Sequence, residues 1–302
     1  MNQLPNPEDE RFWPRLSFMG PPFPHGEYSP SRVVVMPVPY DSTTTARAGA
    51  RDGPDAMIHN SMDMETYDAG LGFEPYLHGI YTSPSVFVTN KSPEAMIDRV
   101  HAVATEFLAD EKFLVTFGGE HTVAVGSFRA HRDRYSNLSV LAIDAHADLR
   151  DEYQDTRYNH ACSLRRMLDD VPVTQVGLRS AALEEAQLIR ERGLPFFSPR
   201  AFRSLPDLSH LIDGLKENVY VTIDLDGIDS GEMPAVGTPE PGGLRWDEVS
   251  ELMEAVSARR RIVGFDVTEL APDLGPKACS YAAAKLAYRM IGLALGPKHE
   301  QP

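Results

Sequence analysis

The stretch LSVLAIDAHADLR, residues 138–150, joins a short apolar run to a cluster of potential metal ligands. Its first six residues are almost all apolar, which is typical of a buried strand. Asp144, His146 and Asp148 follow at once, and extended backbone would point these three side chains, spaced by two, to one side. Buried carboxylates are unfavourable by several kcal/mol each unless a cation neutralises them. The stretch therefore predicts a strand that ends at a cation site.

Similar β-branched runs recur along the chain and alternate with helical patterns. We expect strands at 32–38, 113–117, 138–143, 173–176, 219–223 and 262–267. We expect helices over 93–109, 121–134, 181–192, 246–260 and 278–292. Strands separated by helices form parallel sheets that are covered on both faces. The sequence predicts an α/β fold: a three-layer α/β/α sandwich with a mainly parallel sheet.

The 302 residues contain no internal repeat, low-complexity segment or obvious linker. We therefore expect one domain over residues 31–302. Residues 1–30 are rich in proline and lack a periodic pattern, so we expect an N-terminal arm there, a candidate for packing on a neighbouring subunit.

The bulk composition excludes several classes of partner. A net charge of −15 disfavours nucleic acid and anionic membrane surfaces. No apolar run approaches the ~20 residues of a membrane span, and the N-terminal sequence MNQLPNPEDERFWPRL lacks the apolar stretch of a signal peptide. Two isolated cysteines do not make a disulfide framework or a thiolate zinc site. We expect a cytoplasmic protein.

Acid or imidazole groups follow four of the predicted strands. GGEH ends at His121 after the strand at 113–117, and Asp224 and Asp226 follow the strand at 219–223. Glu269 follows the strand at 262–267. In parallel sheets the ligand site lies beyond the carboxyl ends of the strands, so these groups should converge with the cluster at 144–148. The glycine-rich phosphate loops GxGxxG and GxxxxGK[ST] are both absent, which argues against a nucleotide enzyme.

Six side chains form the candidate metal site: His121, Asp144, His146, Asp148, Asp224 and Asp226. Each motif alone is as often a turn, a helix cap or a solvated loop as a functional site, but three of them after three different strands favour a metal centre. Oxygen-rich sites with some imidazole suit Mn²⁺. Six ligands exceed the needs of one catalytic zinc and fit two ions ~3.5–4 Å apart. Four carboxylates, two divalent ions and one hydroxide leave a net charge of −1, ready for a monocationic group.

Five motifs resemble the ureohydrolases, the arginase and agmatinase superfamily. They are GGEHTV (118–123), AIDAHADLRDEY (142–153), NHACSLRR (159–166), TIDLDGIDSGEMPAVGTPEPGGL (222–244) and DVTELAP (266–272). The resemblance implies an arginase-like fold, a catalytic domain at 31–302 and a homo-oligomer, commonly a trimer or hexamer. It also implies hydrolysis of a guanidino group to urea and an amine at a site with two Mn²⁺ ions per chain.

The resemblance also implies roles for individual residues. One ion would be held by His121, Asp144, Asp148 and Asp224, and the other by Asp144, His146, Asp224 and Asp226, so that Asp144 and Asp224 bridge. Asp226 or a neighbouring ligand would stabilise the tetrahedral intermediate. Glu269 would pair with the substrate guanidinium, which is a favourable bidentate match. His160 would carry a proton; the family usually has glycine next, where this chain has Ala161.

Fewer residues indicate which group the substrate carries on its tail, the end away from the guanidine. Arginases place an acid for the α-amino group where this chain has Ala182, and an asparagine where it has Arg150, whereas EPGGL at 240–244 resembles agmatinases. Arg150, Asp151 and Glu152 are the candidates for contact with the tail. We expect agmatine or N1-aminopropylagmatine as substrate, giving putrescine or spermidine in polyamine biosynthesis.

Four alternatives remain open at the level of sequence. Arg150 would suit the carboxylate of guanidinobutyrate, and arginine is a further substrate to test. A deacetylase-like amidohydrolase would share the architecture but use one zinc and would not need His121. A non-catalytic polyamine-binding relative would not need a metal site that produces hydroxide.

Overall fold

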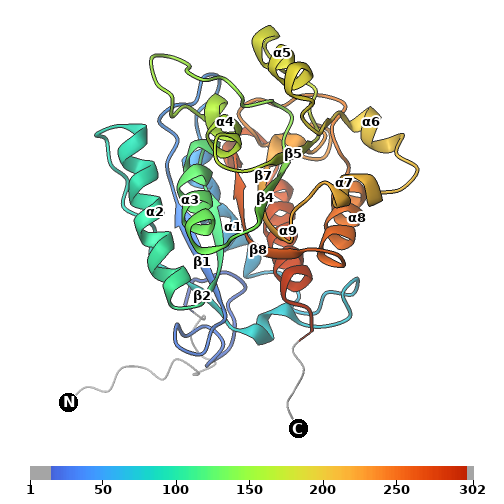
Figure 1. The fold of residues 1–302 in the computed structure, drawn as a ribbon. Helices are drawn as coiled ribbons and strands as arrows, with labels where there is room; N and C mark the ends of the chain where they lie inside the picture. The colour runs from blue at the N-terminus through green and yellow to red at the C-terminus, as the bar shows by residue number, and fades with distance from the viewer. Residues whose placement is uncertain (1–14, 298–302) are drawn as a thin grey trace, which may run out of the picture.

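The computed structural model describes residues 15–297, and a parallel eight-stranded sheet runs through them (Figure 1). The strand order is β2-β1-β3-β8-β7-β4-β5-β6. The strands are β1 (Val33–Val38), β2 (Ile80–Thr82), β3 (Phe113–Gly118), β4 (Leu138–Ile143), β5 (Val173–Val176), β6 (Phe196–Phe197), β7 (Asn218–Asp224) and β8 (Arg261–Thr268). The predicted α/β class and parallel sheet are confirmed.

The four strands that the sequence marked with acid or imidazole are neighbours at the centre of the sheet. β3 pairs with β8, β8 with β7 and β7 with β4, each in parallel. Their carboxyl ends therefore lie side by side at one edge. All six predicted strands are present, whereas β2 and β6 were not predicted.

Helices cover both faces of the sheet. They are α1 (Gly53–Ser61), α2 (Pro93–Ala109), α3 (Ala124–Arg134), α4 (Ser163–Leu168), α5 (Leu183–Arg192), α6 (Pro199–Arg203), α7 (Ser209–Asp213), α8 (Trp246–Ser257) and α9 (Ala278–Leu295). Helices α2, α3 and α4 pack on one face, and α1, α8 and α9 on the other (Figure 1). The three-layer sandwich is therefore confirmed. Within the described residues, no helix is both long and apolar enough to span a membrane.

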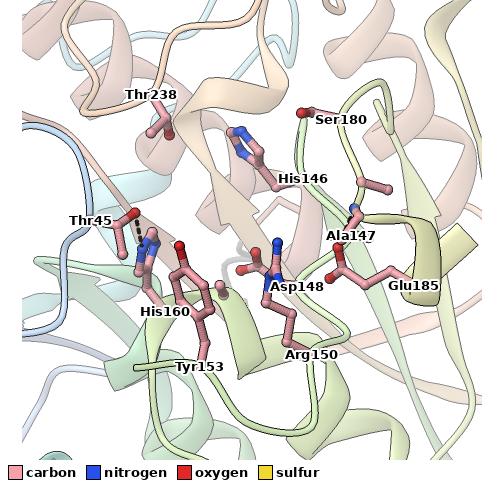
Figure 2. A pocket seen from close by; sticks show the side chains of 13 residues that line it. Thr45, His146, Ala147, Asp148, Arg150, Tyr153, His160, Ser180, Glu185 and Thr238 are labelled. Carbon is pink, nitrogen blue, oxygen red and sulfur yellow. Dashed lines mark hydrogen bonds between the residues drawn. The ribbon is translucent and has the colours of Figure 1, made fainter. Parts of the chain in front are cut away.

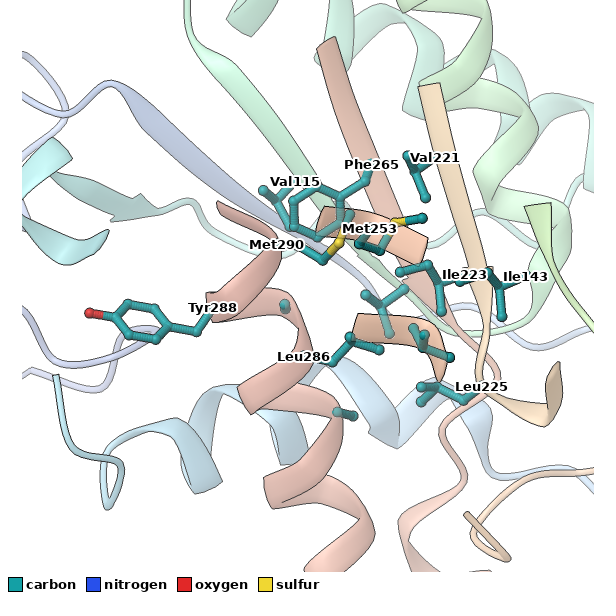
Figure 3. Close-up of a cluster of buried hydrophobic side chains, with 14 of the residues drawn as sticks. Val115, Ile143, Val221, Ile223, Leu225, Met253, Phe265, Leu286, Tyr288 and Met290 are labelled. Atoms are coloured by element: carbon teal, nitrogen blue, oxygen red, sulfur yellow. The ribbon is translucent and has the colours of Figure 1, made fainter. Parts of the chain in front are cut away.

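The core between the sheet and α8 and α9 holds the central strands rigidly. Figure 3 shows Phe265 of β8 and Val221 and Ile223 of β7 facing Met253 of α8 and Leu286 of α9. These side chains are buried, and each contributes roughly 1.5–3 kcal/mol by leaving water. The strand ends that carry the site thus project from a fixed platform.

Several predicted boundaries shift. The helix expected at 121–134 begins as a 3₁₀ turn at His121–Val123 and becomes α3 only at Ala124. Helix α5 starts at Leu183 rather than 181, α8 ends at Ser257 rather than 260, and α9 continues to Leu295.

The predicted N-terminal arm, 1–30, is described only from residue 15, and residues 1–14 lie outside the described part. Phe18 is fully buried and packs edge to face on Phe117 of β3, with ring centroids 5.0 Å apart. This part of the arm therefore contacts the sheet of its own chain. The division at residue 31 stays a prediction.

Candidate metal centre and substrate cavity

The cluster at 144–148 reaches the site by a different path from the predicted one. Strand β4 ends at Ile143, so Asp144, His146 and Asp148 do not continue an extended strand. Asp148 has a positive φ of 49°, a conformation that Asp tolerates better than most residues. Strand alternation therefore does not extend through Asp148, and the predicted reason for the convergence of the three side chains was wrong.

His121 is the centre of the first group of ligands. Its Nδ1 lies 3.3 Å from Oδ2 of Asp144, 3.1 Å from Oδ2 of Asp148 and 3.5 Å from Oδ2 of Asp224. His121 and Asp144 are fully buried. Burial opposes a charge on the imidazole, but the carboxylates of Asp144 and Asp148 outweigh it and raise the pKa of His121 well above its ordinary value. The carboxylates around Nδ1 of His121 therefore favour a positive charge at this position.

A single proton on Nδ1 cannot satisfy three facing carboxylates. Oδ2 of Asp144 is buried and has no hydrogen-bond partner among the described residues, although buried polar atoms are nearly always paired. Burial and the neighbouring acids Asp226 and Asp144 raise the pKa of Asp224 well above its ordinary value. Carboxylate oxygens and an imidazole nitrogen that converge with too few hydrogens to pair them fit a divalent cation as their shared partner.

A second group lies beside the first. Nδ1 of His146 is 2.9 Å from Oδ2 of Asp226 and 3.9 Å from Oδ1 of Asp144. His121, Asp144 and Asp224 offer one set of ligand atoms within 4.8 Å of one another, and Asp144, His146 and Asp226 offer another. Asp144 belongs to both, as the resemblance implied for a bridging ligand. The structure thus brings together all six predicted metal ligands.

Two further contacts shape the ligand loops. A Cβ on Gly119 would lie 2.1 Å from the carbonyl oxygen of Tyr40, so only glycine fits there. The guanidinium of Arg179 donates to the carbonyl oxygens of Asp226 and Glu240, both at 2.7 Å, and to that of Gly177 at 3.0 Å. Arg179 therefore fixes the loop that carries the ligand Asp226.

Glu269 and His160 face a small hollow beside the metal ligands, together with Thr45 and Thr238. Oε1 of Glu269 accepts a hydrogen bond from the backbone N–H of His121 at 2.7 Å and lies 4.0 Å from Nδ1 of His160. Burial raises the pKa of Glu269. Within the described part of the chain no lysine or arginine pairs with Glu269, and such a buried carboxyl group is suited to bind a cationic ligand group.

The loop at 41–45 holds His160 in place. Nε2 of His160 lies 3.1 Å from Oγ1 of Thr45, and its backbone N–H donates to Oγ1 of Thr43 at 3.0 Å. Thr43 in turn donates through its N–H and its hydroxyl, both at 2.7 Å, to the buried Glu120. Burial lowers the pKa of His160, which favours the neutral ring. The sequence did not single out Thr43 or Thr45, because a run of polar residues in a loop carries no periodic signal.

A cavity of about 290 Å³ opens from the metal ligands toward solvent (Figure 2). His146, Asp148 and His160 lie at its inner end, and the wall also includes Arg150, Tyr153 and Glu185. Each Glu185 oxygen accepts one backbone N–H, from Leu149 at 2.8 Å and from Ala182 at 2.7 Å. Sequence analysis missed Glu185; its signal was a glutamate three residues after the N-cap residue of a helix, which is half of the capping-box pattern.

The predicted tail residues separate in the structure. Arg150 lines the cavity, where its guanidinium lies 4.5 Å from the centre of the Tyr153 ring and 3.1 Å from Oε1 of Glu184. Asp151 and Glu152 are exposed and are not among the residues that line this cavity. Hydrogen bonds from Arg166 and Arg157 hold the pKa of Asp151 down to about 2. Glu185 therefore lines this cavity, whereas Asp151 and Glu152 do not.

Comparison with known proteins points to the same kind of protein as the ligand geometry does. A family model described as the Arginase family matches residues 31–292. The chain belongs to the arginase family. Members of this family are hydrolases of amidino C–N bonds with a binuclear metal centre, so the predicted enzyme class and fold family are confirmed.

Individual relatives of this arginase-family chain carry more specific names. The N(1)-aminopropylagmatine ureohydrolase of Synechocystis sp. is 39% identical over 274 residues, which cover 88% of this chain and 90% of the relative. The agmatinase of Pyrococcus horikoshii is 32% identical and covers 86% of this chain and 91% of its own length. The crystal structure of the agmatine ureohydrolase of Thermoplasma volcanium has a TM-score of 0.83 at 30% identity, over 94% of this chain and 96% of that one.

Proposed function

We propose that the chain is a binuclear manganese ureohydrolase that hydrolyses the guanidino group of N1-aminopropylagmatine or agmatine. The products would be urea and spermidine or putrescine, in polyamine biosynthesis. One observation carries the proposal: two ligand groups share Asp144; His146 and Asp148 line the cavity; and the buried Glu269 faces an adjoining hollow that shares Thr45, His160 and Thr238 with that cavity. Relatives at 37–39% identity named N(1)-aminopropylagmatine ureohydrolase support the choice of substrate class.

The ligand set supports two Mn²⁺ ions. His121, Asp144, Asp148 and Asp224 would hold one ion and Asp144, His146, Asp224 and Asp226 the other, so that Asp144 and Asp224 bridge. Carboxylate oxygens with some imidazole are the donors that Mn²⁺ accepts well. Two such ions, when bound, would supply a hydroxide nucleophile at neutral pH, because divalent ions lower the pKa of water.

Glu269 and His160 would act on the guanidino group itself. The carboxylate of Glu269 is fixed by the backbone N–H of His121, and it would orient the planar guanidinium beside the ligands. His160, held by Thr45, would carry a proton to the departing amine. Asp226 keeps Oδ2 within 3.1 Å of the Thr238 hydroxyl, and this pair would face the tetrahedral intermediate.

Glu185 would bind the cationic tail. Its carboxylate lies on the wall of the cavity, and each oxygen keeps a lone pair beyond the one backbone N–H that it accepts. An ammonium group on the tail can donate to those positions. Arginine would bring a carboxylate toward the same wall, where Glu185 would repel it.

Arg150 favours a second candidate, a guanidinobutyrase. Its guanidinium lines the cavity and could receive the carboxylate of guanidinobutyrate. Glu184 already pairs with it at 3.1 Å, so this substrate would have to compete with an existing ion pair. We therefore rank the candidate below a cationic substrate. The match to the arginase family speaks against the single-zinc deacetylase alternative and the non-catalytic one.

The proposal is tested by comparing urea release from agmatine, N1-aminopropylagmatine, arginine and guanidinobutyrate with Mn²⁺ present. We expect kcat/KM for at least one of the two decarboxylated cations to exceed that for arginine by about 10²-fold, because like charges facing each other cost several kcal/mol. A preference for arginine or guanidinobutyrate would overturn the substrate assignment and make Arg150 the carboxylate partner. Release of no urea from any of the four would overturn the proposed function.

Cytoplasmic location and assembly into a trimer or hexamer are part of this proposal and rest on the resemblance. Size-exclusion chromatography with light scattering measures the assembly directly.

A further inference from the structure

A buried chain of hydrogen bonds runs from β8 to the ligand His121. Asp266 of β8 accepts a hydrogen bond from the Thr222 hydroxyl at 2.8 Å and another from the Tyr220 hydroxyl at 2.6 Å. Oγ1 of Thr222 lies 2.9 Å from Nε2 of His121. All four side chains are fully buried. None of Tyr220, Thr222 and Asp266 faces the substrate cavity.

With Asp266 ionised, the hydrogens along this chain can be placed in one way. The Thr222 hydroxyl has one hydrogen, and that hydrogen goes to Asp266. Oγ1 of Thr222 is therefore the acceptor for His121, so Nε2 of His121 must carry a hydrogen. In the neutral ring the other nitrogen, Nδ1, is then unprotonated, and this is the atom that faces Asp144, Asp148 and Asp224.

We infer that Tyr220, Thr222 and Asp266 are positioning residues that hold His121 in the tautomer required to ligate the first divalent ion. The inference rests on the proposed binuclear site. Tyr220 donates to the other carboxylate oxygen, Oδ2 of Asp266, and so helps to orient Oδ1 toward Thr222. Partners behind a ligating histidine commonly set metal affinity by 10–100-fold.

The second group of ligands provides an internal reference. Nδ1 of His146 faces Asp226 and Asp144, and the chain through Thr222 contacts His121 instead. Loss of the chain should therefore weaken the first ion and spare the second. A general loosening of the fold would weaken both ions and lower the thermal stability of the metal-free protein.

The test is a Mn²⁺ titration of the metal-free wild type and of Thr222→Val and Thr222→Ser, by calorimetry and metal analysis. Thr222→Val keeps the shape but removes the hydroxyl, so we expect one of the two ions to bind about 10–100-fold more weakly. Thr222→Ser keeps the hydroxyl and should bind both ions as the wild type does. Asp266→Asn, which removes the acceptor charge, should shift the same ion in the same direction.

The possible outcomes distinguish failure of the positioning role from failure of the proposed function. If the wild type binds two ions and Thr222→Val binds both as tightly, the positioning role is overturned and the proposed function still stands. Equal weakening of both ions in Thr222→Val, or weakening in Thr222→Ser as large as in Thr222→Val, would also overturn it. Wild type that binds fewer than two ions would contradict the proposed function and the inference with it. The melting temperatures of the metal-free variants check that each is folded.

Discussion

Asp144→Asn should lower kcat by more than about 10³-fold and leave the protein unable to hold two metal ions. Asp144 is shared by both ligand groups, and its Oδ2 is buried with no hydrogen-bond partner among the described residues. Asparagine keeps the volume but removes the charge that both ions would need. A metal centre contributes several kcal/mol to transition-state stabilisation, and each 1.36 kcal/mol is a factor of ten in rate.

The metal-free Asp144→Asn protein should be at least as stable as the metal-free wild type. Burial and the neighbouring Asp148 raise the pKa of Asp144, so its charge is unfavourable in the folded chain without an ion. Metal analysis, steady-state kinetics and thermal unfolding of the variant measure the three effects. Asp63→Asn is the matched control, because Asp63 is exposed. Two tightly bound ions in Asp144→Asn, with activity near that of the wild type, would show that Asp144 does not bridge.

Glu269→Gln should lower kcat/KM by roughly 10²–10³-fold while metal content stays at the wild-type level. Removing one charge of a buried, hydrogen-bonded ion pair costs about 2–5 kcal/mol, and here the pair is with the substrate guanidinium. Gln can still accept the backbone N–H of His121 through Oε1, so the variant removes the charge and keeps the contact that Glu269 makes at 2.7 Å.

Glu251→Gln serves as the control for this prediction, because Glu251 is exposed on α8 and far from the ligands in sequence. The kinetic loss should be the same for agmatine and N1-aminopropylagmatine, since both present the same guanidinium. A loss of metal in Glu269→Gln would assign the residue to the metal centre instead. An unchanged kcat/KM would remove Glu269 from the guanidinium site.

The convergence of the six candidate ligands was predictable because each motif follows a strand with a clear pattern. The runs at 113–117, 138–143 and 219–223 are mostly apolar, and parallel strands bring their ends to one edge. Strands β2 and β6 were not predictable in the same way, since three and two residues are too short to show a period.

The wall of the cavity depended on features that sequence patterns do not encode. Asp151 and Glu152 looked suitable because they are acidic and follow the ligand motif, but the loop turns them outward, toward Arg157 and Arg166 in the case of Asp151. Glu185 lines the cavity, and its carboxylate turns back to accept the backbone N–H of Ala182 at the start of α5. The adjacent Glu184 pairs with Arg150 instead.

Titrating the metal-free protein with Mn²⁺ while following urea release from agmatine and N1-aminopropylagmatine tests the binuclear site most directly. We predict that activity rises until two ions per chain are bound and then stays constant, because the two ligand groups around Asp144 each need an ion before the centre is complete. Full urea release at one ion per chain, with no further gain from a second, would contradict a binuclear ureohydrolase.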